Sequence, residues 1–121
     1  MSKGNVFISG ASRGIGKSIA NHFAKNDYKV IGTSRNDFEF NNKSENLIPL
    51  KLDITSRDDV KKCFNDLKSK DLLPDILINN AGITSDQLFL KMKDDDWDNV
   101  ISTNLTGTYN LTKIFIRNMI K

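Results

Sequence analysis

The chain of 121 residues is poor in cysteine and histidine, with one of each. A single cysteine, Cys63, excludes an intrachain disulfide and is typical of a reducing compartment. Cys63 stands at helical spacing from Val60 and Leu67, which indicates a packing role rather than a nucleophile. The histidine, His22, falls on the polar side of a predicted helix, so we expect it at the surface without a catalytic role.

Long hydrophobic runs and clustered charges are missing as well. No apolar stretch approaches about 18 residues, and the N-terminus lacks the apolar core of a signal peptide. The net charge of +3 is dispersed among many acidic residues, whereas a nucleic-acid-binding domain carries a clustered basic surface. We therefore expect a cytoplasmic protein with no membrane segment, no nucleic-acid partner and no metal site.

What remains has the composition of one globular domain. Hydrophobic residues make up 38% of the chain and charged residues 27%, which is an ordinary balance for a soluble protein. A chain of this length buries roughly 65% of its unfolded surface on folding. No internal repeat or low-complexity segment divides the sequence. We expect a single domain spanning residues 1–121.

Apolar segments alternate with helical patterns along the chain. Helical patterns follow the first, third and fourth apolar segments, and the last helix is predicted from about Asp95 to the end of the chain. The polar connection 35–46 is long enough for only about one helical turn. This alternation predicts an α/β fold of the Rossmann type, a doubly wound parallel sheet with strand order 3-2-1-4. Its predicted strands cover 5–9, 28–34, 47–53 and 75–79.

The carboxyl ends of the predicted strands hold most of the residues with useful chemistry. In an open parallel sheet, ligands bind at this edge, near the point where the strand order reverses. A glycine turn follows the first strand, the sequence NNAG follows the fourth, and the last helix begins nearby. The topology alone therefore predicts the place of the site.

The glycine turn at 10–16 has features of two phosphate-binding loops. A P-loop requires glycine, four residues, and then Gly-Lys-Ser or Gly-Lys-Thr. Counting back from Gly-Lys-Ser at 16–18, the first glycine would fall at Ala11, whereas Gly10 stands one residue too early. Asp53 follows a strand and has the chemistry to hold magnesium. A P-loop nucleotidase therefore stays open as the lesser alternative.

A dinucleotide-binding loop explains the same turn better. Gly10, Gly14 and Gly16 allow a tight turn, a close approach of backbone to a pyrophosphate, and close packing of helix on strand. NAD-selective sites place an acidic residue at the end of the second strand, but this chain has Arg35 there. A guanidinium pairs with a 2′-phosphate, and Arg13 adds a second cation. These residues favour NADP(H) over NAD(H).

Four motifs in this order resemble the short-chain dehydrogenase/reductase family over essentially the whole chain. The stretch 79–113 is most similar to the family's bacterial reductases of 3-oxoacyl chains on acyl carrier protein, which act in fatty-acid synthesis. The resemblance implies an NADP(H)-dependent oxidoreductase that reduces the carbonyl of a small-molecule or carrier-linked substrate, with a homotetramer as the full-length assembly. The motifs are GASRGIG at 10–16, LDIT at 52–55, NNAG at 79–82 and TNL at 103–105.

The resemblance also implies roles for individual residues. Asn104 matches the asparagine of the family's Asn-Ser-Tyr-Lys tetrad, where it positions a water that relays protons to the lysine. Asp53 matches the residue that contacts the adenine amine. The residues that match cofactor contacts are Gly10, Ser12, Arg13, Gly14, Ile15, Gly16, Arg35, Asp53, Ile54, Asn79, Ala81 and Gly82.

The sequence departs from the family's pattern toward its C-terminus. The family's catalytic serine and Tyr-x-x-x-Lys pair fall beyond Lys121, and the chain ends in a helical pattern without a stop signal. Tyr109 and Lys113 have the same spacing, but they precede the aligned position, so we interpret them as ordinary helix residues. We expect residues 1–121 to be the N-terminal, dinucleotide-binding half of an enzyme, inactive alone. The alternative is a non-catalytic dinucleotide-binding or interaction module.

Overall fold

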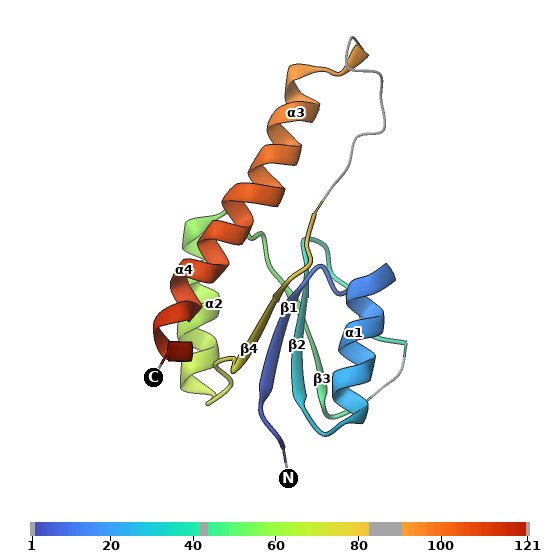
Figure 1. Ribbon diagram of the computed structural model, residues 1–121, viewed down its shortest axis with the longest axis vertical. Helices are drawn as coiled ribbons and strands as arrows, with labels where there is room; N and C mark the ends of the chain where they lie inside the picture. The colour runs from blue at the N-terminus through green and yellow to red at the C-terminus, as the bar shows by residue number, and fades with distance from the viewer. Residues whose placement is uncertain (1, 42–43, 83–90, 121) are drawn as a thin grey trace.

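A computed structural model describes residues 2–41, 44–82 and 91–120, and these form a parallel sheet with helices on both faces (Figure 1). In the described residues the sheet has four strands in the order β3-β2-β1-β4, which confirms the predicted α/β class and strand order. The strands are β1 (Asn5–Ser9), β2 (Lys29–Ser34), β3 (Leu47–Lys51) and β4 (Ile76–Asn79). The α-helices are α1 (Gly14–Lys25), α2 (Arg57–Ser69), α3 (Asp94–Ile101) and α4 (Gly107–Ile120).

The central strand β1 is apolar throughout because both of its faces are covered. Val6, Phe7 and Ile8 are fully buried, and alternate side chains enter different cores. Val6 and Ile8 pack on the α1 side, together with Ala20 of that helix. Phe7 packs on the other side, under α2 and α4. Two cores on one sheet hold the strand ends, and therefore the site, in a fixed arrangement.

The core beneath α2 and α4 is built around aromatic contacts. The rings of Phe7 and Phe115 lie 4.9 Å apart between centroids, and Phe64 lies 6.0 Å from Phe115. Val60 and Leu67 of α2 are buried in this cluster, as the helical spacing predicts. The packing fixes α4 against the sheet and sets the position of the helical segment that precedes it.

The connection from β2 to β3 differs from its prediction. Its described residues, 35–41 and 44–46, form no helix, so the expected helical turn is wrong there. Phe40 is buried in the core on the α1 face, and its ring lies 5.2 Å from that of Phe38. The ring sits so close to the sheet that a Cβ on Gly32 would lie 2.7 Å from it. Aromatic side chains therefore cover the sheet where a helix would otherwise pack.

The last helix is continuous but changes its winding. Asp94, Asp95 and Asp96 form the first turn of α3, where carboxylates favour the positive helix end, close to the predicted start at Asp95. Between α3 and α4 the residues Ser102–Thr106 form a π-helical turn, which the sequence did not predict. Such turns occur often at functional sites. This one carries Thr103 and Asn104.

Candidate functional site

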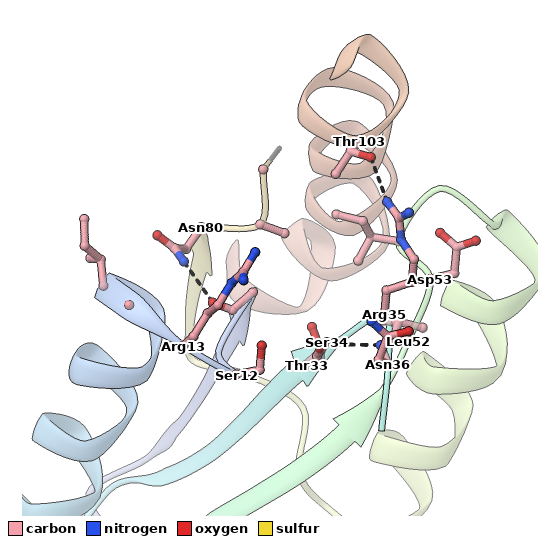
Figure 2. A pocket seen from close by; sticks show the side chains of 16 residues that line it. Ser12, Arg13, Thr33, Ser34, Arg35, Asn36, Leu52, Asp53, Asn80 and Thr103 are labelled. Atoms are coloured by element: carbon pink, nitrogen blue, oxygen red, sulfur yellow. Dashed lines mark hydrogen bonds between the residues drawn. The ribbon is translucent and has the colours of Figure 1, made fainter. Parts of the chain in front are cut away.

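A cavity of about 500 Å³ opens at the carboxyl ends of the strands, at the predicted edge of the sheet (Figure 2). Ten of the thirteen predicted site residues line the cavity, namely Gly10, Ser12, Arg13, Gly14, Ile15, Arg35, Asp53, Ile54, Ala81 and Gly82. The remaining lining residues were not predicted as site residues from the sequence, and they are Thr33, Ser34, Asn36, Leu52, Asn80 and Thr103.

The glycine turn needs its glycines for two physical reasons. Gly10 and Gly14 have φ angles of +73° and +61°, a left-handed conformation that side chains with a Cβ rarely adopt. A Cβ on Gly10 would also lie 2.8 Å from the Cα of Ala81, and one on Gly16 would overlap the carbonyl oxygen of Gly10. Apart from its chain neighbours and its own helix, no described residue lies within 4 Å of a Cβ at Gly14. The turn is therefore closely packed at Gly10 and Gly16 and open at Gly14, which leaves its backbone accessible to a ligand.

The turn after β4 is tied to the glycine turn by hydrogen bonds. The side-chain amide of Asn80 donates to the carbonyl oxygen of Gly10 at 2.9 Å. The Oγ of Ser9 accepts from the backbone N–H groups of Asn80 and Ala81, at 3.2 and 3.0 Å. Ser9 is 1% exposed, and a hydroxyl at the end of a buried strand is the signal that could have identified it. These bonds join the two loops into one rim.

The first turn of α1 faces the cavity, and its own N-cap side chain does not cap it within the described residues. Its N-cap residue, Arg13, is extended and makes no side-chain cap bond, and the first turn contains no acidic residue. Uncapped amides at a helix N-terminus form an anion site. Lys17 and Ser18 are not among the described residues that line the cavity, although a P-loop would direct both toward phosphate and magnesium.

Two arginines give the cavity a positive rim. Arg13 belongs to the glycine turn, and Arg35 follows β2. Arg35 donates a hydrogen bond from Nη2 to the Oγ1 of Thr103 at 3.0 Å, across the cavity wall (Figure 2). A planar guanidinium suits bidentate recognition of a phosphate. The rim therefore has the chemistry to hold a phosphorylated ligand.

The acid in the cavity wall, Asp53, is held ionised. Its Oδ1 accepts from the Thr55 hydroxyl at 2.6 Å and from the Thr55 backbone N–H at 3.0 Å. The bond from the Thr55 hydroxyl is the main reason why the pKa of Asp53 is lowered. Burial raises the pKa, whereas the bond from the Thr55 backbone N–H and the charge of Arg35 lower it further. Asp53 is therefore a carboxylate at neutral pH, able to accept hydrogen bonds from a ligand.

The three other predicted residues are not among the described residues that line the cavity. Gly16 is buried at the start of α1. Asn79 is exposed, and its side chain donates to the Oγ1 of Thr112 on α4 at 3.1 Å. Asn104 lies on the π-helical turn, where its Oδ1 would be 3.1 Å from a Cβ on Gly82. The structure thus places Asn104 next to the end of the NNAG turn, and its role stays a prediction.

Tyr109 and Lys113 lie on a different surface of the molecule. They line a groove of about 700 Å³ between α2 and α4, together with residues such as Arg57 and Phe64. The Nζ of Lys113 donates to the Tyr109 hydroxyl at 3.1 Å, which is the main reason for the lowered pKa of this tyrosine. Neither residue lines the cavity at the strand ends among the described residues. The pair is therefore not placed to act on a ligand there.

Other candidate chemistry is weak in the part of the chain that the structure describes. No group of three or more His, Cys, Asp or Glu side chains could hold a metal ion in these residues. None of their helices is long and apolar enough to cross a membrane. Cys63 is buried, and burial raises the pKa of its thiol to about 12, so it is no nucleophile. His22 is exposed.

The strand order and the cavity at its switch point place the protein in the class of Rossmann-type α/β proteins. The sequence model of the family described as short chain dehydrogenase matches residues 4–121, and the chain belongs to this family.

Curated relatives with known names are similar over nearly the whole chain. The 3-oxoacyl-[acyl-carrier-protein] reductase FabG of Salmonella typhimurium is 38% identical over 120 residues, which cover 96% of this chain and 49% of the relative. The reductase of the same name from Buchnera aphidicola subsp. Baizongia pistaciae is 42% identical over 119 residues, covering 94% of this chain and 49% of the relative. The chain spans about half the length of the curated relatives it matches.

Solved structures agree on the fold. A short chain dehydrogenase from Leptospira borgpetersenii with bound NAD+ has a TM-score of 0.90 at 30% identity, covering 98% of this chain and 46% of its own. The protein ElxO with NADP bound has a TM-score of 0.85 at 40% identity, covering 98% of this chain and 51% of its own. Both dinucleotides therefore occur among the structural relatives.

Proposed function

We propose that residues 1–121 form the dinucleotide-binding, N-terminal half of an NADP(H)-dependent oxidoreductase that reduces a carbonyl group. One observation carries the proposal: the glycine turn, the open N-terminus of α1 and two arginines surround a single cavity at the switch point of the sheet. A dinucleotide presents the matching chemistry, because its pyrophosphate needs N–H donors and its ribose needs polar or charged partners.

The lining residues fit the parts of a dinucleotide in order along the cavity. The pyrophosphate would lie over the first turn of α1, where a Cβ at Gly14 meets nothing within 4 Å. Arg35, with Arg13, would pair with a 2′-phosphate, which supports NADP(H) over NAD(H). Asp53 and Ile54 line the wall at the end of β3, where we propose that adenine binds.

The chemistry divides between the cofactor and the protein. A bound nicotinamide supplies or accepts the hydride at the carbonyl carbon. The proton for the carbonyl oxygen must come from an acid held near it. In the family this acid is a tyrosine, and a serine and a lysine assist it. We assign Asn104 the family role of positioning a water for that relay, which is supported by its place beside Gly82.

For the substrate we propose a 3-oxoacyl chain on acyl carrier protein. The support is the identity of 38% to a reductase that carries this substrate in its name. A free small-molecule carbonyl compound is the other candidate, since a relative of known structure at 33% identity, from Thermoplasma acidophilum, is named as an aldohexose dehydrogenase.

We propose that residues 1–121 alone bind the cofactor without turning substrate over. Tyr109 and Lys113 have the required spacing, but they face the groove between α2 and α4 instead of the cavity. A non-catalytic dinucleotide-binding or interaction module is the alternative, and the same observation supports it. The coding sequence after Lys121 distinguishes the enzyme half from the non-catalytic module. A frame that continues into a serine and a Tyr-x-x-x-Lys pair would support the enzyme.

The proposed setting is a homotetramer in the cytoplasm. Support for assembly comes from α4, where Ile116 and Ile120 are 46% and 78% exposed although both are large and apolar. A buried, unreactive Cys63 is consistent with a reducing compartment.

Equilibrium titration tests the cofactor proposal. NADPH, NADH and ATP with Mg²⁺ are titrated separately against the protein, with nicotinamide fluorescence or calorimetry as the readout. We expect NADPH to bind most tightly. Preference for ATP with Mg²⁺ would support the P-loop alternative, and no binding of either dinucleotide would contradict the proposal. Reduction of acetoacetyl thioester by residues 1–121 alone would contradict the proposed lack of turnover.

A further inference from the structure

We propose that Thr103 is a positioning residue that sets the preference for NADP(H), because it holds the guanidinium of Arg35 in the cavity wall. The inference rests on the proposed function and extends it to a residue on a distant part of the chain. The observation behind it is the hydrogen bond of 3.0 Å from Arg35 Nη2 to Thr103 Oγ1, which joins residues 68 positions apart (Figure 2).

Thr103 is built to be a fixed acceptor. It is 6% exposed, although it lies on the long helix that leads away from the sheet (Figure 1). A threonine in a helix has two main χ1 rotamers, and burial together with the bond from Arg35 favours the one seen here. The π-helical turn Ser102–Thr106 shifts the helical register at this point and directs Thr103 to the cavity. The hydroxyl is therefore held in place before any ligand arrives.

Arg35 needs such an acceptor because packing does little to restrain its side chain. The residue is exposed and follows the last residue of β2, so sheet pairing does not hold it. An arginine side chain has many rotamers, and a ligand that orders the side chain must overcome the entropy of all of them. Holding the guanidinium in advance removes part of that cost and increases affinity for a group that contacts it.

The chemistry of the acceptor decides whether the guanidinium stays available. The alternative partner is Asp53, whose carboxylate lies near enough for the charge of Arg35 to lower its pKa. A carboxylate would neutralise Arg35 and compete with an incoming phosphate. A hydroxyl accepts one N–H and leaves the positive charge and the remaining N–H groups to the ligand. Thr103 therefore orients Arg35 without weakening its attraction for a 2′-phosphate.

This assignment predicts an effect on one cofactor only. NADPH and NADH differ at the 2′-position, so losing the Thr103 hydroxyl should weaken NADPH binding and spare NADH binding. A purely structural role of Thr103 would weaken both to the same degree. The ratio of the two dissociation constants is thus the quantity that separates positioning from packing.

The experiment measures dissociation constants of NADPH and NADH by fluorescence titration for wild type, Thr103→Val and Thr103→Ser. Thr103→Val removes the acceptor at constant volume, and we expect it to lower the preference for NADPH about five- to tenfold. Thr103→Ser keeps the hydroxyl and should retain most of the preference. Thr106→Val is the matched control, because it makes the same change on the same π-helical turn outside the cavity lining.

A double-mutant comparison completes the test. In an Arg35→Ala background, Thr103→Val should have no further effect on the ratio, because its only route is through Arg35. A further drop there, or an unchanged ratio in the single variant, would overturn the inference while leaving the proposed function intact. If wild type binds NADPH no better than NADH, the NADP(H) proposal itself fails. If Thr103→Val does not fold, Thr103→Ala removes the same hydroxyl without adding a methyl group, and an unchanged ratio in that variant would also overturn the inference.

Discussion

The helices α1 and α2 both begin where a strand has ended, but their N-termini are completed in opposite ways. At α2 the Oγ of Ser56 accepts the N–H of Asp59 at 3.2 Å, and two aspartates occupy the first turn. At α1 the N-cap residue Arg13 makes no side-chain cap bond within the described residues, and no acidic residue lies in the first turn. The chain supplies the negative partner for one helix and leaves the other open toward the cavity. The difference identifies α1 as the helix end shaped for an outside anion.

Converting the α1 end into one like that of α2 should give the largest effect. Arg13 is extended at the N-cap position, so Arg13→Asp supplies a cap and raises the free energy of unfolding by about 0.5–1 kcal/mol. The same carboxylate would repel a pyrophosphate, and we expect NADPH to bind about a hundredfold more weakly. Paired urea unfolding and fluorescence titrations measure the two effects.

The neutral control for this change is Arg13→Ser, which offers a cap without a negative charge. We expect a loss of NADPH affinity of about tenfold, between wild type and the aspartate variant. Unchanged NADPH affinity in Arg13→Asp would contradict the assignment of this helix end to the cofactor.

The close approach of α1 to the glycine turn provides the next test. A Cβ at Gly16 would overlap the carbonyl oxygen of Gly10, so Gly16→Ala should lower the free energy of unfolding by about 2 kcal/mol. Gly14→Ala is the matched control, because no other described part of the chain lies within 4 Å of its Cβ and only its φ of +61° is strained. Its loss should be about 1 kcal/mol. If urea unfolding shows equal losses of unfolding free energy for the two variants, the close contact between Gly16 and Gly10 is not what stabilises the turn.

At α2 the cap should matter for stability alone. Ser56→Ala removes the acceptor for the Asp59 N–H and should cost about 1 kcal/mol of unfolding free energy. NADPH affinity should stay within about twofold of wild type, measured well below the unfolding temperature. Ser56→Asp, which restores an acceptor, is the control. A large loss of NADPH affinity in Ser56→Ala would remove the contrast between the two helices.

The smallest effect concerns the turn that leads into α2, and it depends on pH. Asp53 has a lowered pKa mainly because the Thr55 hydroxyl donates a hydrogen bond to it. The stabilisation from this bond is therefore fully present above the unfolded-state pKa of 3.8 and is lost as the pH falls through the lower pKa of the folded state. Thr55→Val should therefore be less stable by about 0.5–1 kcal/mol at pH 7. The difference should shrink below about pH 4. Thr55→Ser, followed by thermal unfolding across pH, is the control, and a pH-independent difference would contradict this cause.

The sheet was predictable because its strands are short apolar segments joined by connections of limited length. Residues such as Val6, Phe7 and Ile8 are apolar in succession, which indicates a strand covered on both faces. Handedness rules then gave the strand order. The absence of a helix in the described part of the connection between β2 and β3 was not predictable, because it depends on Phe40 filling the space against Gly32.

The π-helical turn could not be predicted from the sequence either. The residues of Ser102–Thr106 are compatible with an ordinary helix. Contacts beyond the turn accompany the shifted register: Gly107 lies against Ile54, and the Asn110 side chain donates to the Ile54 carbonyl oxygen at 2.9 Å. Both contacts join α4 to the loop between β3 and α2, far away in sequence.

The glycine turn could be found from its residues, since only glycine suits its conformation and contacts. Asn80 and Thr103 could not be assigned in this way, because each contributes through a bond to a residue about 70 positions away. Local patterns identify backbone requirements, whereas side-chain bridges between loops require the fold.

The most direct test of the contrast between the two helix ends is the response of their backbone amides to NADPH. In ¹⁵N–¹H spectra of labelled protein, we predict that the amides of Gly14, Ile15 and Gly16 shift strongly on saturation, while those of Asp58 and Asp59 keep their positions. Larger shifts at Asp58 and Asp59, or no shift at Gly14–Gly16 under saturating NADPH, would contradict the account.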